Sequence, residues 1–188
     1  ADIPNTAWLV RCRKDAMLCL PAPKSSRRVY AKERFTPDSI RTNNAIPWKT
    51  AQIFHGGAKR PVRFKDIPLV LWPGGTQRIP LRLIVLAPTP YRCTSKGKVF
   101  YRQPAFLLTT DLLAPPELLI QMYFDRWEIE VNHRDEKSIL GVGHAQVRSP
   151  KSVPRQPAFV VAIYAALLLA ALSCFGAQRT NDYLPLPN

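Results

Sequence analysis

The run LLIQMYFDRWEIEVNHRDEKSIL, residues 118–140, decides how this chain is interpreted. We predict that it forms one long helix. Pro115 and Pro116 suit the first turn, where a backbone donor is not needed, and Glu117 suits the positive end of the helix dipole. Gly141 suits the helix end. The run AFLLTTD, residues 105–111, has the composition of a strand, so a strand is expected directly before the helix.

Four polar side chains share one side of this predicted helix: Tyr123, Arg126, Glu130 and Lys137. At about 100° per residue they fall within an arc of about 60°. Apolar residues flank this arc on both sides. The opposite arc holds Gln121, Asp125, Glu128, Asn132, Asp135 and Glu136. We therefore predict that the charged arc faces the core and that the opposite arc faces water.

Helix geometry alone leaves two interpretations of the charged arc open. Arg126 and Glu130 are four residues apart, and so are Glu130 and Arg134. Such pairs are common on helices and stabilise them by only about 0.2–0.5 kcal/mol each. The arc is therefore either a set of ordinary helix salt bridges or a functional face.

The spacing Tyr-x2-Arg-x3-Glu-x6-Lys resembles the signature of the insertion-sequence DDE transposases, notably the insertion sequence 4 superfamily. The chain matches all four signature positions, and the flanking strand and Leu140-Gly141 fit as well. The resemblance implies an enzyme that cuts DNA and transfers its strands by phosphoryl transfer. Its partners would be transposon ends and target DNA, and it would form a homo-oligomer as a full-length protein. A cytoplasmic location is expected separately, from cysteines that form no paired motif.

The resemblance also implies a fold. Such enzymes have an α/β, RNase H-like catalytic domain with a mixed sheet and a β-rich insertion before the Glu-bearing helix. This chain would cover the C-terminal part of that domain. Residues 1–20 would hold one of its strands, 21–104 a basic β-rich insertion, 105–178 a strand, the Glu-bearing helix and a buried C-terminal helix, and 179–188 a tail.

Roles for single residues follow from the resemblance. Glu130 would be the catalytic carboxylate and a ligand in a two-metal site for Mg²⁺ or Mn²⁺, which need several oxygen ligands. Tyr123, Arg126, Lys137 and Arg134 would bind DNA. Arginine suits phosphate because it can donate two parallel hydrogen bonds, whereas lysine acts as a point charge.

The two aspartates of such a site are hard to place. Asp2 is a weak candidate for the second of them. Asp15, Asp38 and Asp66 are expected at the surface, and Asp111 is expected to cap the turn before the helix. One carboxylate cannot hold two metal ions, so we expect the isolated chain not to cut DNA. Metal binding would require aspartates from outside it.

The charge of the chain is high and uneven. Its 188 residues include 27 Lys and Arg and 13 Asp and Glu, for a net charge of +14. Residues 1–110 hold 20 basic and 5 acidic side chains, whereas residues 111–188 hold 7 and 8. A surplus of this size favours an anionic partner, with nucleic acid the leading class. The attraction is expected mainly in the first part of the chain.

Strands are predicted at residues 6–13, 61–72, 78–91 and 99–111, because β-branched and apolar runs alternate there with turn residues. Residues 21–60 are expected to be basic and loop-rich. The four cysteines, at 12, 19, 93 and 174, form no C-x-x-C pair or zinc motif, so we expect reduced thiols.

Residues 158–175, AFVVAIYAALLLAALSCF, are apolar and long enough either for a core helix or for a membrane span. With the upstream signature we prefer a core helix, ended by Gly176, and no membrane. Two alternatives to a transposase segment stay open: a non-catalytic, basic nucleic-acid-binding protein derived from a transposase, and a small membrane protein anchored by this run.

Overall fold

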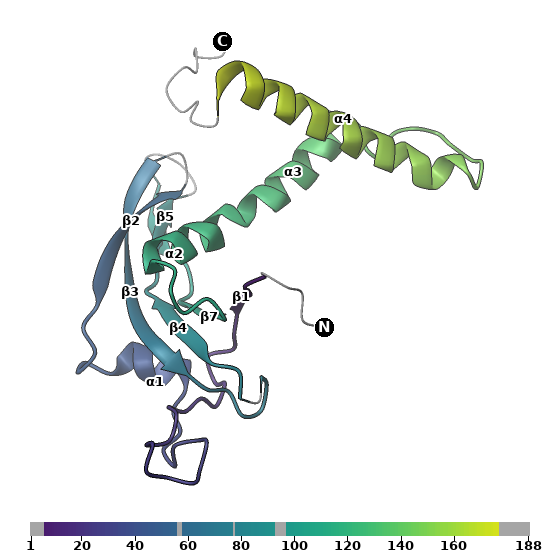
Figure 1. Cartoon of the computed structure of the whole chain (residues 1–188). Helices are drawn as coiled ribbons and strands as arrows, with labels where there is room; N and C mark the ends of the chain where they lie inside the picture. The colour runs from purple at the N-terminus through teal and green to yellow at the C-terminus, as the bar shows by residue number, and fades with distance from the viewer. Residues whose placement is uncertain (1–5, 56–57, 77, 93–96, 177–188) are drawn as a thin grey trace. The chain divides into compact units, whose positions relative to one another are not determined.

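The computed structural model describes residues 6–55, 58–76, 78–92 and 97–176. It divides into two compact units, residues 1–124 and residues 125–188. The first unit holds β1 (Leu9–Arg11), α1 (Pro37–Thr42), β2 (Lys49–His55), β3 (Ala58–Val70), β4 (Leu81–Leu86), β5 (Pro90–Arg92), β6 (Val99–Tyr101), β7 (Ala105–Thr109) and nearly all of α2 (Pro116–Asp125). The second holds α3 (Trp127–Ser138) and α4 (Ser152–Phe175) (Figure 1).

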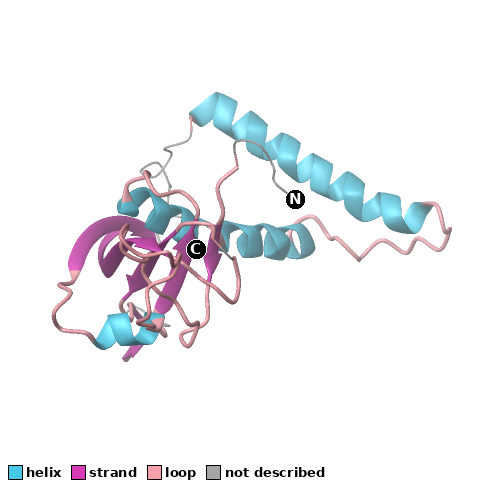
Figure 2. Ribbon diagram, turned by 60° about the horizontal axis from the view of Figure 1, so that its bottom comes forward, coloured by secondary structure: helices cyan, strands magenta, loops and turns pink. Residues whose placement is uncertain are grey.

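The first unit is built on a five-stranded sheet with the order β1-β7-β4-β3-β2 (Figure 2). Each neighbouring pair in it is antiparallel. The fold is therefore mixed α/β, as predicted, but the part of the sheet that the structure describes has no parallel pair. A mixed sheet is not seen there: β2, β3 and β4 are successive antiparallel neighbours, β7 pairs with the other side of β4, and β1 pairs with β7.

Both faces of the sheet are covered, which explains the continuous apolar runs of the central strands. Every residue of β4 and β7 is buried. In β4, Ile84 and Leu86 face a cluster that includes residues of α2, whereas Leu83 and Val85 face a cluster that includes residues of α1. Successive side chains of a strand point to opposite faces, so both sets must be apolar when both faces are covered.

Each of the four predicted strand ranges contains a strand, but residues 78–91 are divided between β4 and β5, and residues 99–111 between β6 and β7. Two further elements were missed within residues 21–60. α1 begins with a capping box: the Thr36 side chain accepts from Ser39 N, and the Ser39 side chain accepts from Thr36 N. Pro37 occupies the first turn. In β2, the alternation that buries Ala51 and Ile53 was also legible in the sequence.

The predicted long helix is interrupted at Arg126. α2 ends at Asp125 and α3 begins at Trp127, although Arg126 itself keeps right-handed helical angles (φ −52°, ψ −28°). The boundary between the two compact units falls next to this break, between Phe124 and Asp125. A single helix carrying all four signature residues was therefore wrong, because the chain passes from one packing unit to the next at this point.

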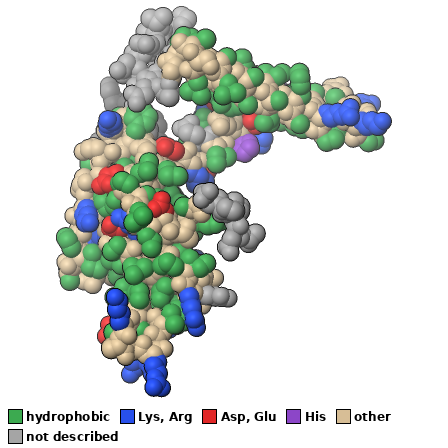
Figure 3. Space-filling view, viewed as in Figure 1, with side chains coloured by type: hydrophobic (Ala, Val, Ile, Leu, Met, Phe, Trp, Pro, Cys, Tyr) green, Lys and Arg blue, Asp and Glu red, His purple; other side chains and the backbone are tan. Residues whose placement is uncertain are grey.

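α4 is a helix as predicted, and Gly176 with a φ of 74° ends it. Its predicted burial is wrong, since no residue of α4 is buried. Within its unit it contacts α3, where the Tyr164 hydroxyl donates to Asn132 Oδ1 at 3.1 Å. Hydrophobic side chains cover much of the surface of α4 (Figure 3). A single neighbouring helix, α3, cannot cover all of this surface. By length and composition, α4 is also the single helix in the described ranges that could cross a membrane.

Three of the four cysteines lie within the described residues. Cys12, Cys19 and Cys174 are unpaired, which confirms free thiols at these positions. Burial raises the pKa of the Cys12 thiol to about 11. Cys93 lies outside the described residues.

Candidate functional site

Tyr123 lies on α2 and belongs partly to the core of the first unit. Its half-buried ring packs against the cluster that contains Leu119 and Ile120, and it meets the Phe124 ring edge-on at 5.7 Å. Phe124 in turn stacks on His55 at 4.7 Å. The predicted orientation toward the core holds for Tyr123.

Gln121 holds α2 against the open edge of the sheet. Its side-chain amide accepts from Phe54 N at 2.8 Å and donates to Phe54 O at 2.9 Å. β2 is the last strand of the sheet, so these backbone groups would otherwise face water. The expectation that Gln121 simply faces water was wrong, because its amide matches the donor and acceptor of an unpaired strand edge.

Arg126 and Glu130 form an exposed ion pair in the second unit. Arg126 Nη1 lies 3.3 Å from Glu130 Oε1, and the two side chains are 57% and 46% exposed. Lys137 is also exposed, in the last turn of α3. These charged groups do not face a core, and the flanking Trp127 and Ile129 are exposed as well. The predicted orientation was therefore wrong for all three.

Arg134 does not pair with Glu130, although it lies four residues away. Its guanidinium donates to Asp135 Oδ1 at 2.9 Å from Nη2 and 3.0 Å from Nε. Of the two helix salt bridges considered from the sequence, only Arg126–Glu130 forms. The exposed Arg126–Glu130 pair contributes little stability, so it does not prevent Arg126 or Glu130 from binding another partner.

On α3, the more buried side is the one opposite the signature residues Glu130 and Lys137. Asn132 accepts the hydrogen bond from Tyr164, and Glu136 is only 9% exposed. His133 Nδ1 lies 3.5 Å from Glu136 Oε2. Asn132 and Glu136 are one turn apart and so share a face. The prediction that this arc faces water was wrong for Asn132 and Glu136, which are partly or fully buried, and is confirmed for Asp125, which is exposed.

Asp15, Asp38 and Asp111 each have a hydrogen-bond partner of their own. Asp15 lies 2.7 Å from Arg13, and Asp38 lies 2.7 Å from Arg41; in each case the hydrogen bond from the arginine lowers the pKa of the carboxyl. Asp111 Oδ1 accepts from the backbone N–H groups that precede α2, which lowers its pKa and confirms the predicted cap.

Asp66 is not a surface residue, which corrects the expectation from the sequence. It lies on β3, and Arg82 on β4 donates to it from Nε at 2.8 Å and from Nη2 at 2.9 Å. Both side chains are 8% exposed. Arg82 Nη1 also donates to Ala114 O at 2.6 Å, and the pairing with Asp66 raises the pKa of Arg82. The pair ties two strands to the segment that leads into α2.

The described residues do not fit a metal centre. Among them, no group of three or more His, Cys, Asp or Glu is arranged to hold a metal ion. Asp2 lies outside the described residues. Magnesium and manganese need several oxygen ligands, and Glu130 supplies one side chain. No reaction step can therefore be derived through a metal from these residues.

Cations lie over aromatic rings at several places in the first unit, which the sequence did not indicate. The contacts, from the cation to the ring centroid, are Arg34–Tyr30 at 5.6 Å, Arg63–Trp48 at 5.2 Å, Lys65–Trp48 at 4.8 Å and Arg102–Tyr91 at 5.6 Å. Only Tyr30 and Arg34 are close in the sequence, four residues apart, so the other contacts depend on the tertiary fold.

Comparisons with known protein families, curated proteins and solved structures find no match to this chain.

Proposed function

We propose that this chain is the C-terminal catalytic-domain segment of a DDE transposase with an RNase H-like fold. The observation that carries the proposal is the signature spacing along α2 and α3, which follow β7, with Arg126 at the break between them paired to Glu130 of α3 and both side chains accessible. The intervening β-rich region between β1 and β7 is consistent with the insertion that such enzymes have. The isolated chain is expected to be inactive.

The proposed roles follow from the chemistry of the exposed groups. Arg126 can exchange its 3.3 Å contact with Glu130 for a bidentate bond to a phosphate, because exposed ion pairs are weak. Lys137 would add a point charge on the same helix. Tyr123 would contact the DNA strand from α2. Glu130 would be the third carboxylate of the full enzyme, whose other ligands the described residues do not supply.

One observation favours a second candidate function, a non-catalytic nucleic-acid-binding protein. Twenty basic and five acidic side chains lie within residues 1–110, and several of these cations lie over aromatic rings. Such surfaces hold nucleic-acid strands by charge and stacking without any chemistry.

Binding to duplex DNA, measured by fluorescence anisotropy over a range of salt, distinguishes a specific role of α3 from general attraction. Arg126→Gln should weaken binding and reduce the magnitude of the salt slope by about 1. Arg148→Gln is the matched control, because it removes one exposed positive charge from the same unit. Equal losses in the two variants would contradict a signature role and favour the general binder.

A supercoiled-plasmid nicking assay with Mg²⁺ or Mn²⁺ tests the expected inactivity of the isolated chain. We expect no nicking. Nicking that disappears in Glu130→Gln would show that the chain supplies further carboxylates. Purification without detergent is the accompanying test of the membrane alternative, since a monodisperse sample excludes an α4 anchor.

A further inference from the structure

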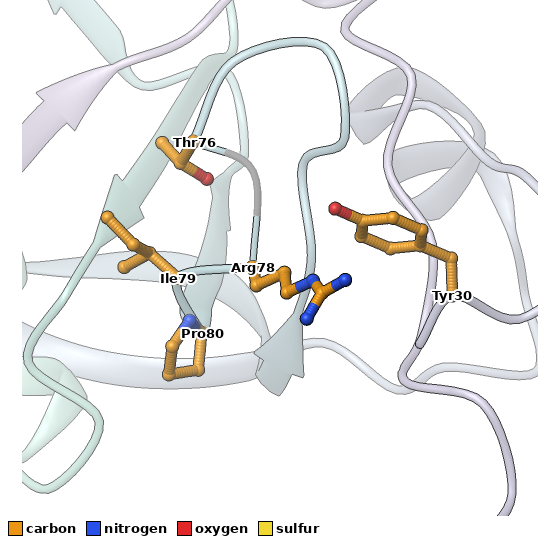
Figure 4. Close-up of a pocket in the computed structure, with 5 residues that line it drawn as sticks. All are labelled: Tyr30, Thr76, Arg78, Ile79 and Pro80. Carbon is orange, nitrogen blue, oxygen red and sulfur yellow. The ribbon is translucent and has the colours of Figure 1, made fainter. Parts of the chain in front are cut away.

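A pocket of about 580 Å³ lies in the first unit, away from the signature residues in sequence. It is lined by Tyr30, Thr76, Arg78, Ile79 and Pro80 (Figure 4). Tyr30 comes from the basic segment before α1, and the other four come from the connection between β3 and β4. The volume is within the range of small-ligand sites.

Thr76 contributes an unpaired polar group to the lining of the pocket. Its Oγ1 is buried and has no hydrogen-bond partner, and it is the one such side-chain atom among the described residues. The backbone around it is ordered by hydrogen bonds from Thr76 N to Trp72 O at 3.0 Å and from Ile79 N to Thr76 O at 3.1 Å. A buried hydroxyl without a partner costs free energy, so a ligand that bonds to it removes a penalty.

The other polar groups of the pocket suit an anion. Arg78 is exposed, and in the part of the chain that the structure describes it has no ion pair with a carboxylate. Its guanidinium and the Tyr30 hydroxyl extend toward the same space in Figure 4. Among the residues that the structure describes, none that lines the pocket is acidic. A guanidinium and two hydroxyls are the donor set that binds a phosphate oxyanion.

The remaining walls suit an organic group attached to that anion. Ile79 and Pro80 are apolar, and the Tyr30 ring is oriented by Arg34, whose guanidinium carbon lies 5.6 Å from its centroid. We propose that this pocket binds a phosphate ester of the nucleotide type, with the phosphate on Arg78 and Thr76. The ester is either part of a nucleic-acid strand or a free mononucleotide. This inference does not rest on the function proposed for α3.

Titration of the whole chain by calorimetry and by NMR shifts of Thr76 and Arg78 tests the proposal. The probes are adenosine monophosphate, adenosine and a short oligothymidylate. Adenosine monophosphate should bind and shift both residues, whereas adenosine should not, because the phosphate carries the interaction. Oligothymidylate that shifts the same residues identifies a strand as the source; binding of the monophosphate alone identifies a free nucleotide.

Three variants distinguish specific binding in this pocket from nonspecific electrostatic attraction to the basic chain. Arg78→Gln should weaken binding of the monophosphate by about tenfold or more, since it removes a charged donor. Arg60→Gln, at the start of β3, is the charge-matched control and should have little effect. Thr76→Val should weaken binding while raising the melting temperature of the free protein, because it removes the unpaired hydroxyl. Equal losses for Arg78→Gln and Arg60→Gln, or unmoved Thr76 signals, would overturn the proposal whatever Arg126→Gln does.

Discussion

Replacing Asp66 by asparagine should strongly destabilise the first unit. The substitution keeps the shape of the side chain but removes the carboxylate that pairs with Arg82, and both groups are 8% exposed. Removing one partner of a buried pair costs about 3–5 kcal/mol, because the other charge stays buried without compensation. Arg82 keeps its bond to Ala114 O, and the asparagine carbonyl accepts one more. We therefore expect the lower end, about 3 kcal/mol.

A loss of this size is large beside a total stability of about 5–15 kcal/mol. For a unit of this length it should lower the melting temperature by roughly 10 °C. Thermal and urea unfolding followed by near-ultraviolet circular dichroism measure the change, since Trp48 and Trp72 lie in this unit. Hydrogen exchange of the β3 and β4 amides should rise, which places the loss in the sheet.

Asp15→Asn is the matched control for this experiment. It makes the same chemical change in an exposed pair whose distance to Arg13, 2.7 Å, is even shorter. Its melting temperature should stay that of the wild type, because solvent screens exposed pairs. If Asp66→Asn shifts the midpoint no more than this control, the argument from burial is refuted. In an Asp66→Leu background, Arg82→Met should recover much of the stability, since no buried charge then remains.

Three further predictions rest on single side chains of the described chain. Burial, and then nearby arginines, lower the pKa of His55 below its ordinary 6.5, so the unfolded state takes up the proton first and stability should fall as the pH is lowered through about 6.5. Melting curves of His55→Gln should lack much of this fall. Lys65 is 1% exposed and donates to three backbone carbonyls at the end of α1, at 2.7–3.0 Å. Lys65→Met should lower the free energy of unfolding, measured with urea, by about 1–3 kcal/mol. An unchanged urea midpoint would contradict the role of Lys65 in capping α1. Cys174 is exposed, whereas burial raises the pKa of the Cys12 thiol to about 11. Iodoacetamide at about pH 8 should therefore alkylate Cys174 far faster than Cys12, as measured by peptide mass mapping. Equal rates of labelling would contradict the burial of Cys12.

Local sequence patterns predicted most of the secondary structure. The strands near β3, β4 and β7 were found because β-branched and apolar residues are bounded there by turn residues. α1 was missed although Thr36, Pro37 and Ser39 carry its start signal, since a helix of six residues has little periodicity to detect. The break at Arg126 has no local signal, because neither proline nor glycine lies near it.

The sequence predicted which side chains of the candidate site pair with each other, but not whether those side chains are buried or exposed. The i,i+4 spacing of Arg126 and Glu130 is a local property of a helix, and that pair forms. The direction in which a helix face points depends on what packs against it. Asn132 of the polar arc therefore meets Tyr164 of α4 and Glu136 is buried, while Glu130 of the signature is exposed.

By itself, the sequence determined the helix and strand types, the uneven positive charge and the spacing of the signature residues, all of which depend on neighbours along the chain. Only the tertiary structure decided which charges are buried and which polar groups meet. It joins Asp66 to Arg82 within the sheet, and it brings Tyr30 beside Thr76 and Arg78. Both results depend on strand order and packing, which bring together residues that no local pattern connects.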